Sequence, residues 1–303
     1  MVNRLLNKIA IVTGSASGIG RAIALLFAAE GATVIVTDLQ ESSLLSAAEG
    51  TDGHLTTVQE IEKGGGRAVF VKANIAVAAD VEALVQEAVT LFGRLDIFVN
   101  NAGTGEDRKK IWEYREEQWD KILNINLKGV FLGTKYASRQ MVEQTAGPSG
   151  DKGWIVNIAS IWGLSGQTNY TGYTAAKHGV IGLTKTAALD CAPHRIHVNA
   201  LCPGFTNSAM THHVFSDDTL KAHLLQRHPF RGLGEGKDIA RAALFLASED
   251  ASWVTGVGIP VDGGYSINGK DDRTKLRAAK DYDQEGSRVL IQEAGHHLVP
   301  NAF

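Results

Sequence analysis

Short apolar runs alternate with longer amphipathic segments along most of the chain, and this alternation predicts the fold. Runs rich in Val, Ile and Leu are typical of buried strands, whereas apolar residues three and four apart are typical of helices with one buried face. The predicted strands cover residues 9–13, 33–37, 67–72, 95–100, 154–158, 196–201 and 258–261, and the predicted helices cover 21–30, 80–92, 118–144, 173–191 and 237–248. We therefore expect an α/β fold, a doubly wound parallel sheet of about seven strands with helices on both faces.

Two segments depart from this alternation. Residues 39–66 are longer than one crossover helix needs and contain Gly50 and Gly53, which predicts two short helices or a helix and a loop. Residues 266–303 form a C-terminal extension that is heavily charged at first and more apolar toward its end. The sequence has no internal repeat and no linker rich in Pro, Gly or Ser, so a single domain over residues 1–265 is the economical interpretation.

Composition and charge exclude several classes of partner. The formal net charge of the 303 residues is −3, without a basic block of the kind that binds nucleic acid or a membrane surface. No apolar stretch is long enough to span a bilayer, and the start lacks the pattern of a signal peptide. Cys191 and Cys202 are expected to be buried thiols in a reducing compartment. These features favour a cytoplasmic protein that acts on a small molecule, and we interpret the sequon at 169–171 as coincidence.

A glycine-rich turn follows the first predicted strand, where residues 13–20 read TGSASGIG. Glycines let the backbone approach a pyrophosphate, whose charge is met by amide N–H groups and the positive end of a helix. Such a sequence is often only a turn, but Asp38 ends the second strand twenty residues after Gly18. A carboxylate there can accept from both ribose hydroxyls and repels a 2′-phosphate, which predicts NAD rather than NADP. The alternative is that Asp38 caps a helix starting near Gln40.

Polar residues and turns follow three other predicted strands. Asn74 and Ile75 come after the third strand, residues 100–103 (NNAG) after the fourth, and Pro203-Gly204 after the sixth. In an open parallel sheet the carboxyl ends of the strands line the ligand crevice. We therefore expect the first two segments near the adenine and its ribose, and Pro203-Gly204 near the nicotinamide.

Tyr173 and Lys177 lie four residues apart in a predicted helix and so share one face. A neighbouring ammonium favours the phenolate, so we expect Lys177 to lower the pKa of Tyr173 from its ordinary value of about 10. Ser160, at the end of the preceding strand, can hydrogen-bond the same oxygen and hold an alcohol or carbonyl in reach. Tyr and Lys at this spacing are common on helices, and the pair alone is weak evidence for catalysis.

Together these motifs resemble the classical short-chain dehydrogenase/reductase family, from about residue 7 to residue 265. The similarity rests on TGSASGIG at 13–20, NNAG at 100–103, Asn126 in NINLKG, Ser160 in NIAS, YTAAK at 173–177, Pro203-Gly204 and DGG at 262–264. It implies a Rossmann-type fold and hydride transfer between a nicotinamide cofactor and a secondary alcohol or ketone, without a metal. Departures from the family's pattern are Asn74 for Asp, Ala159 for Ser and Ser208 for Thr; Asn74 and Ser208 keep a usable oxygen, and Ser160 keeps the catalytic spacing.

The resemblance assigns four catalytic roles. Tyr173 is the general acid/base, and Lys177 lowers its pKa and binds the nicotinamide ribose. Ser160 steadies the substrate oxygen, and Asn126 holds a water that connects Lys177 to bulk solvent. The predicted cofactor-binding residues are Gly14, Ser17, Gly18, Ile19, Gly20, Asp38, Leu39, Asn74, Ile75, Asn101, Ala102, Gly103, Tyr173, Lys177, Pro203, Gly204, Thr206 and Ser208.

Residues 205–230 correspond to the family's substrate lid. Large apolar side chains in and near this lid suggest an apolar or cyclic substrate; they are Trp162, Leu164, Tyr170, Met210 and Phe215. The alternative is that these side chains simply pack the loop. The lid histidines are expected to be solvated, because a metal site at His212, His213 and Asp217 is disfavoured by the diverging directions of adjacent residues.

The resulting hypothesis is an NAD-dependent oxidoreductase of a secondary alcohol or ketone. The alternatives are a biosynthetic ketoreductase of the same family and a non-catalytic NAD sensor. Family members usually form tetramers, so a homo-oligomer, tetramer or dimer, is expected. The extension 266–303 then packs on a neighbouring subunit or covers an active site, or it is a frayed end.

Overall fold

The computed structural model describes residues 3–42, 55–211 and 218–268, which lie in one compact unit ending at Asn268. Seven parallel strands form a single sheet in the order β3-β2-β1-β4-β5-β6-β7. They are β1 (Ile9–Thr13), β2 (Thr33–Asp38), β3 (Arg67–Lys72), β4 (Ile97–Asn100), β5 (Gly153–Ile158), β6 (Ile196–Pro203) and β7 (Gly258–Val261). The predicted doubly wound sheet is confirmed, and its order reverses between β1 and β4, where such sheets bind their ligands.

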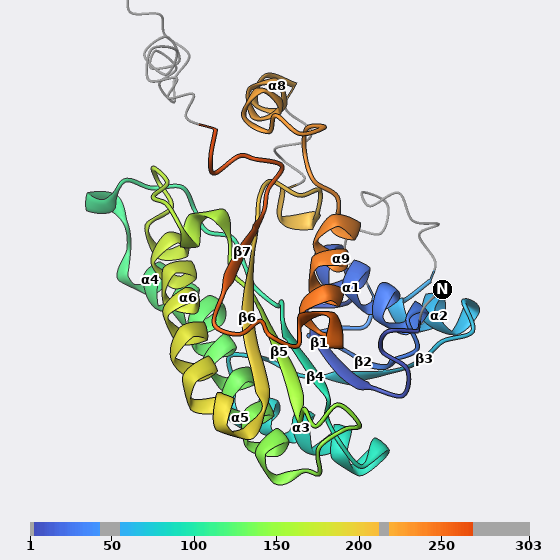
Figure 1. Ribbon diagram of the computed structural model, residues 1–303. Helices are drawn as coiled ribbons and strands as arrows, with labels where there is room; N and C mark the ends of the chain where they lie inside the picture. The colour runs from blue at the N-terminus through green and yellow to red at the C-terminus, as the bar shows by residue number, and fades with distance from the viewer. Residues whose placement is uncertain (1–2, 43–54, 212–217, 269–303) are drawn as a thin grey trace, which may run out of the picture. The chain divides into compact units, whose positions relative to one another are not determined.

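Helices cover both faces of the sheet (Figure 1). One face carries α1 (Gly18–Ala29), α2 (Thr57–Lys63) and α9 (Gly236–Leu246), and the other carries α3 (Ala78–Phe92), α4 (Glu116–Leu123), α5 (Gly129–Glu143) and α6 (Thr171–Cys191). Side chains of a strand alternate between the two faces. Accordingly, Val12 of β1 packs in the core with Phe27 of α1, whereas Ile11 packs in the core with Leu84 of α3.

The helix predicted over 118–144 is interrupted in the structure. It consists of α4, a π-helical segment η2 (Asn124–Lys128) and α5. The π-helical segment places Asn126 fully inside the protein, at 0% exposure. At the start of α5, a Cβ on Gly129 would lie 2.1 Å from Cδ1 of Ile75. Because π-helical turns do not change the spacing of apolar residues enough to be seen, the pattern predicted one helix.

The loops at the carboxyl ends of the strands contain the short elements that face the site. These are η3 (Ile161–Gly163) after β5, and η5 (Ala209–Thr211) and α8 (Asp218–Arg227) after β6. The predicted helix in 39–66 is α2, whose capping box joins Thr56 and Gln59, while residues 43–54 lie outside the described ones. The expectation for the extension also falls outside them beyond Asn268. No helix of the described segments is long and apolar enough to cross a membrane.

Candidate active site

The glycine-rich loop between β1 and α1 is in close backbone contact with the turn that follows β4. Gly14 has a φ of +65°, and a Cβ there would lie 2.7 Å from Cα of Ala102. A Cβ on Gly20 would lie 2.2 Å from the carbonyl oxygen of Gly14 and 2.5 Å from Nδ2 of Asn101. Both positions therefore require glycine, because any larger residue would push the loop away from this turn.

Thr13 joins these two segments. Its hydroxyl accepts hydrogen bonds from the N–H groups of Asn101 (3.0 Å) and Ala102 (3.1 Å). The Asn101 side chain donates back to the carbonyls of Thr13 (2.8 Å) and Gly14 (3.1 Å). Thr13 was not among the predicted cofactor-binding residues, although it is the first residue of the TGSASGIG motif. Its role as an anchor is visible only in three dimensions.

The N-terminal end of α1 follows directly on the glycine-rich loop. Among the described residues, the N-cap Ser17 makes no side-chain cap hydrogen bond, and no acidic residue stands in the first turn, which holds Gly18, Ile19 and Gly20. The first N–H groups of a helix lack intrahelical partners and carry the positive end of its dipole. This cradle, lined by glycine backbone, fits the pyrophosphate of a dinucleotide.

Asp38 ends β2 beside the glycine-rich loop. Its Oδ2 accepts from the N–H of Ala16 at 3.2 Å, and its Oδ1 accepts from the N–H of Leu39 at 2.8 Å. Each carboxylate oxygen keeps a further lone pair for a ribose hydroxyl. Residues 39–42 are not helical, so the alternative role as a cap of a helix near Gln40 is not supported.

The other predicted adenine-side residues flank this position. Leu39 is 58% exposed, and Asn74 is exposed with its Oδ1 accepting from the N–H of Ala76 at 3.0 Å. Ile75 packs against Gly129 at the start of α5. Asn74 is therefore used in a local turn, and its remaining lone pair is what could contact an adenine amine.

The three predicted catalytic side chains meet at the end of β5. Ser160 lies close enough to the Tyr173 phenol to lower its pKa, and Oγ of Ser160 accepts from the N–H of Trp162 at 3.2 Å. Nζ of Lys177 lies 5.5 Å from the centre of the Tyr173 ring and donates to the carbonyl of Ile158 at 2.8 Å. A hydroxyl, a phenol and an ammonium are thus brought together where β5 ends and α6 begins.

The protonation of Tyr173 differs from the sequence-based expectation. Burial raises the pKa of Tyr173 to about 12, with the hydrogen bond to Ser160 acting in the opposite direction. Burial likewise lowers the pKa of Lys177 from 10.5 to about 8. The prediction that Lys177 lowers the pKa of Tyr173 is wrong here. The ammonium faces the ring and a main-chain carbonyl, so removal of water from the phenol is the larger effect.

Asn126 is tied to the loop after β4 by both ends of its amide. Its Oδ1 accepts from the N–H of Thr104 and its Nδ2 donates to the carbonyl of Thr104, each at 2.8 Å. A Cβ on Gly103 would lie 2.9 Å from the same Oδ1. The side chain therefore fixes the loop that follows Asn101–Gly103.

The segment after β6 faces the same region. The N–H of Gly204 donates to Val261 at 3.0 Å, and Thr206 is 3% exposed with its hydroxyl donating to Gly204 at 3.1 Å. The hydroxyl of Thr211, which sequence reasoning did not single out, lies 3.1 Å from the Ser208 hydroxyl and donates to the carbonyl of Thr206 at 2.6 Å. These hydrogen bonds hold the segment after β6 together beside β7. It contains the predicted residues Pro203, Gly204, Thr206 and Ser208.

An aromatic group borders the catalytic residues. The ring of Trp162 lies 4.3 Å from that of Tyr170, 5.8 Å from Tyr173 and 5.6 Å from Phe205, measured between ring centres. Trp162 is only 9% exposed, so most of its surface is packed within the wall of the site. Leu164 and Met210 are each 42% exposed, whereas Phe215 lies outside the described residues.

The lid histidines do not all fit the expectation of a solvated loop. His228 is 2% exposed, and its Nδ1 lies 2.7 Å from the carbonyl of Leu224. Its burial lowers its pKa, which favours the neutral ring. His212, His213 and Asp217 lie outside the described residues, and no group of three His, Cys, Asp or Glu within the described ranges could hold a metal ion.

Sequence relatives of the chain are oxidoreductases. The family described as Enoyl-(Acyl carrier protein) reductase matches residues 14–266. The chain is 39% identical over 264 residues to the 3-oxoacyl-(acyl-carrier-protein) reductase FabG of Thermotoga maritima, covering 87% of this chain and 100% of the relative. It is also 39% identical over 266 residues to the cyclohexanol dehydrogenase of Acinetobacter sp. strain SE19, covering 88% of this chain and 98% of the relative.

Solved structures give the same assignment. Levodione reductase is similar with a TM-score of 0.78 and 33% identity, over 87% of this chain and 99% of that chain. A putative 2-deoxy-d-gluconate 3-dehydrogenase from Agrobacterium tumefaciens with bound NADP is similar with a TM-score of 0.76 and 33% identity, over 88% and 99%. The chain therefore belongs to the classical short-chain dehydrogenase/reductase family, whose members are oxidoreductases acting on CH–OH groups or ketones.

Proposed function

We propose that the protein transfers a hydride between NAD and a secondary alcohol or its ketone, with Tyr173 as the general acid/base. The observation that carries this proposal is the meeting of Ser160, Tyr173 and Lys177 at the end of β5. The glycine-lined N-terminal end of α1, which carries the positive end of the helix dipole, offers the place for the cofactor's pyrophosphate. The nicotinamide supplies the chemistry of hydride acceptance and donation, and the protein's own part is orientation and proton transfer.

The proton chemistry follows from the buried phenol. With a pKa near 12, Tyr173 is protonated at neutral pH, the form that donates a proton to a ketone oxygen. Oxidation of an alcohol needs the phenolate instead and is therefore expected to become faster as pH rises. Ser160 holds the substrate oxygen through its hydroxyl, and Lys177 binds the nicotinamide ribose through Nζ. Asn126 supports the route of the proton to solvent by shaping the π-helical segment.

Asp38 supports NAD as the preferred cofactor. Its Oδ2 contacts the glycine-rich loop at Ala16, and a 2′-phosphate at this position would meet a carboxylate without a counter-charge in the contacts described for it. The Agrobacterium protein with bound NADP shows that both cofactors need a direct test within this family. Fluorescence titration with NADH and NADPH is expected to give the tighter binding with NADH, and Asp38→Asn is expected to reduce that preference by about tenfold. Tighter binding of NADPH by the unchanged protein would overturn the choice of NAD.

Two substrate classes are in contention. An apolar or cyclic alcohol or ketone is supported by the wall of Trp162, Tyr170 and Phe205, by the exposed Leu164 and Met210, and by the similarity to a cyclohexanol dehydrogenase. A 3-oxoacyl thioester is the second candidate. It is supported by the similarity to the Thermotoga reductase and by the protonated state of Tyr173, which suits the reductive direction.

The decisive experiment is a substrate panel with the Tyr173→Phe variant beside the unchanged protein. Cyclic ketones, their alcohols and 3-oxoacyl thioesters are assayed by NADH absorbance in both directions. Removal of the phenol hydroxyl is expected to lower kcat by at least about 10³-fold and to leave NADH binding nearly unchanged. Turnover that persists in the variant contradicts the assignment of Tyr173. NADH binding without turnover of any panel member favours the NAD sensor.

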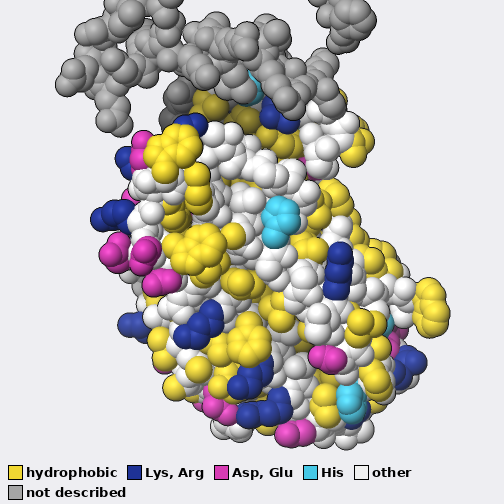
Figure 2. Space-filling model, turned by 90° about the vertical axis from the view of Figure 1, so that its left-hand side faces the viewer, with side chains coloured by type: hydrophobic (Ala, Val, Ile, Leu, Met, Phe, Trp, Pro, Cys, Tyr) yellow, Lys and Arg dark blue, Asp and Glu magenta, His cyan; other side chains and the backbone are white. Residues whose placement is uncertain are grey.

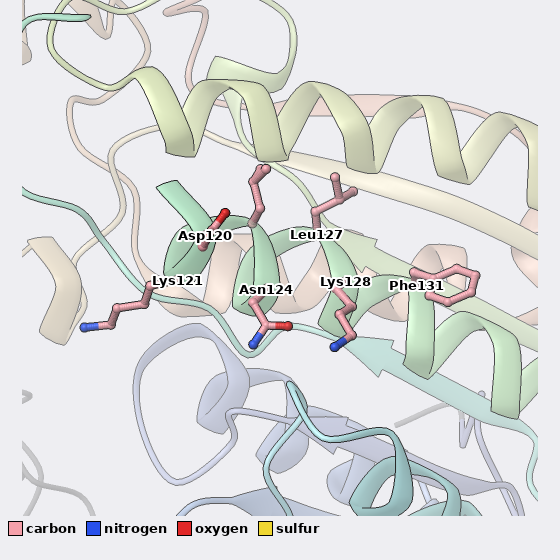
Figure 3. A pocket seen from close by; sticks show the side chains of 7 residues that line it. Asp120, Lys121, Asn124, Leu127, Lys128 and Phe131 are labelled. Carbon is pink, nitrogen blue, oxygen red and sulfur yellow. The ribbon is translucent and has the colours of Figure 1, made fainter. Parts of the chain in front are cut away.

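A homo-oligomer, dimer or tetramer, remains part of the proposal. Hydrophobic side chains gather in several groups on the side of the molecule that carries α4, α5 and α6 (Figure 2). On these helices Trp119 (36%), Phe131 (45%) and Leu189 (77%) are exposed. Phe131 also lines a hollow beside the π-helical segment, next to Leu127, which points toward α6 (Figure 3). Light scattering at micromolar concentration is expected to give a multiple of 32.4 kDa, and a monomer would refute the expectation.

The reducing environment of the cytoplasm suits the two cysteines. Cys191 and Cys202 are both free and buried. We expect cytoplasmic localisation on this basis, and fractionation of cells that express the protein is the test.

A further inference from the structure

The first turn of α6 is held by a residue from another part of the chain. Within residues 55–211, Tyr170 at the N-cap makes no side-chain cap hydrogen bond, and no acidic residue stands in the first turn. Instead, Oε1 of Glu106 accepts from the N–H of Tyr173 at 3.0 Å and Oε2 accepts from the N–H of Gly172 at 3.2 Å. A carboxylate is thus bound to the main chain of the proposed general acid/base itself. It comes from the loop between β4 and α4, 67 positions earlier.

Glu106 is itself fixed on both sides. The hydroxyl of Tyr114 donates a hydrogen bond to Oε2, and burial together with this carboxylate raises the pKa of Tyr114, which keeps the phenol protonated as a donor. A Cβ on Gly172 would lie 2.6 Å from the Tyr114 hydroxyl and 3.1 Å from Oε2 of Glu106. The position therefore admits only glycine without a shift of these groups. The first turn of α6, the Glu106 carboxylate and the Tyr114 phenol therefore pack together as one unit.

The loop that carries Glu106 is also anchored near the cofactor site. Thr104, two residues earlier, makes both hydrogen bonds with the Asn126 amide. The preceding Asn101 is bound to the glycine-rich loop. One short loop therefore connects the nucleotide cradle, the π-helical segment and the start of α6. A displacement at Glu106 would move Tyr173 relative to the other two.

We propose that Glu106, held by Tyr114, is a positioning residue for the reaction, which fixes the first turn of α6 and thereby the Tyr173 hydroxyl opposite Ser160. This inference rests on the proposed role of Tyr173 as the acid/base. Its negative charge also acts on the phenol, since Glu106 contributes to raising the pKa of Tyr173. A helix cap with only a structural role would fix the helix without any effect on proton transfer.

Other groups near the phenol must stay constant in a test. Besides Glu106, the titratable and charged neighbours of Tyr173 are Tyr170 at the N-cap and Lys177 one turn further on. Arg108 lies over the ring of Tyr170, 5.4 Å from its centre. Changes at Glu106 and Tyr114 leave all three side chains in place, so a shift in the titration of Tyr173 reports on the carboxylate.

The test compares Glu106→Gln, Glu106→Ala and Tyr114→Phe with the unchanged protein. Gln keeps one acceptor oxygen but loses the charge, so kcat is expected to fall about tenfold and the pH midpoint of proton transfer to move lower. Ala removes both acceptors, and kcat is expected to fall about 10²-fold because the reacting group is misplaced. Tyr114→Phe is expected to have an intermediate effect. KM for NADH should stay within about twofold, because the α1 cradle is not altered.

A second readout does not depend on turnover. The ionisation of Tyr173 is measured by absorbance at 295 nm, as the difference between each protein and its own Tyr173→Phe derivative. Loss of the Glu106 charge is expected to lower this midpoint, because the carboxylate contributes to raising the pKa of Tyr173. The measurement still tests the inference if no substrate is found, and it separates failure here from failure of the proposed activity. It remains informative through Glu106→Gln if Glu106→Ala does not fold.

The matched control is Thr56→Ala, which removes the cap of α2 away from the catalytic helix. It is expected to reduce thermal stability while leaving kcat, its pH profile and the Tyr173 titration unchanged. If the Glu106 variants behave like this control, with reduced stability and an unchanged profile and titration, the positioning role is overturned.

Discussion

The helices α1 and α6 both begin at the site, but their N-terminal ends are treated in opposite ways. At α1 the described residues place no acidic residue in the first turn and Ser17 makes no side-chain cap, and the glycines lie close to the turn after β4. At α6 the first turn is occupied by Glu106, which binds the N–H groups of Gly172 and Tyr173. The same physical feature, the positive end of a helix, therefore serves two purposes in the proposed mechanism.

A positive helix end can bind an anionic ligand, whereas an end filled by a carboxylate of the same chain holds that side chain in place. We propose that the positive end of α1 uses main-chain N–H groups to bind a pyrophosphate. The filled end of α6 uses those groups within the protein, and Tyr173 becomes part of a rigid unit with Glu106 and Tyr114. The difference indicates that cofactor affinity and placement of the acid/base can be altered separately.

The largest effect on activity and stability is expected from a substitution of Lys177, which lies one turn after Tyr173 in α6. Lys177→Met removes the ammonium that we propose to bind the ribose, and kcat is expected to fall at least about 10³-fold. The free protein should nevertheless become more stable. Lys177 is 4% exposed, and its pKa is lowered from 10.5 to about 8 by burial. This shift corresponds to about 3 kcal/mol at neutral pH, and loss of the bond to Ile158 offsets about 1 kcal/mol of it.

The pH dependence of the free energy of unfolding tests whether the buried charge of Lys177 causes this gain in stability. Between pH 8 and 10.5 the unfolded chain binds more protons at Lys177 than the folded one, so the stability of the unchanged protein rises with pH in this window. Below pH 8 both states are protonated and the full penalty applies. Urea unfolding at pH 7 and pH 9.5 should show the advantage of Lys177→Met shrinking by about 2 kcal/mol. An equal difference at both pH values would rule out the buried charge as its cause.

The next largest effect is expected from a substitution in the first turn of α1. A Cβ on Gly20 would lie 2.2 Å from the Gly14 oxygen, so Gly20→Ala must push the loop away from the NNAG turn. NADH binding, measured by fluorescence, is expected to weaken about 10²-fold, with a loss of stability of about 1–3 kcal/mol.

Gly182→Ala is the matched control for this substitution. Gly182 is exposed on α6, and a Cβ there meets no described atom within 4 Å. It is expected to leave NADH binding unchanged and to raise stability by about 0.5–1 kcal/mol, because alanine favours the helix. Equal NADH affinity in the two variants would mean that the tight approach at Gly20 does not matter for the cradle.

What the sequence predicts well is local in the chain. The seven strands follow from apolar runs, and the nucleotide loop follows from glycines and Asp38 within one βαβ unit. Ser160, Tyr173 and Lys177 could be placed because Ser160 follows β5 closely and the other two lie on α6, the next α-helix along the chain. The glycine-rich start of α1 was predictable for the same reason.

What the sequence does not predict depends on distant contacts. Glu106 has no local signal, since its partners lie 66 and 67 positions away. The π-helical segment at Asn126 is stabilised by Thr104, 22 positions earlier, and leaves the apolar pattern almost unchanged. The pKa of Tyr173 was predicted in the wrong direction because spacing gives the neighbour Lys177 but not the loss of water around the phenol.

The smallest expected effect distinguishes a cap that serves a ligand from a cap that serves the fold. Ser17 and Thr56 both stand at helix N-caps, but only Thr56 accepts a hydrogen bond from its own helix, from the N–H of Gln59 at 3.3 Å. Ser17→Ala is therefore expected to change stability by less than about 0.5 kcal/mol and to weaken NADH binding about threefold to tenfold. Thr56→Ala should cost about 1 kcal/mol and leave NADH binding unchanged. Thermal melts of the two variants check the expected stabilities, and NADH titrations check the expected affinities. A loss of stability in Ser17→Ala without a change in NADH binding would show that Ser17 is an ordinary helix cap.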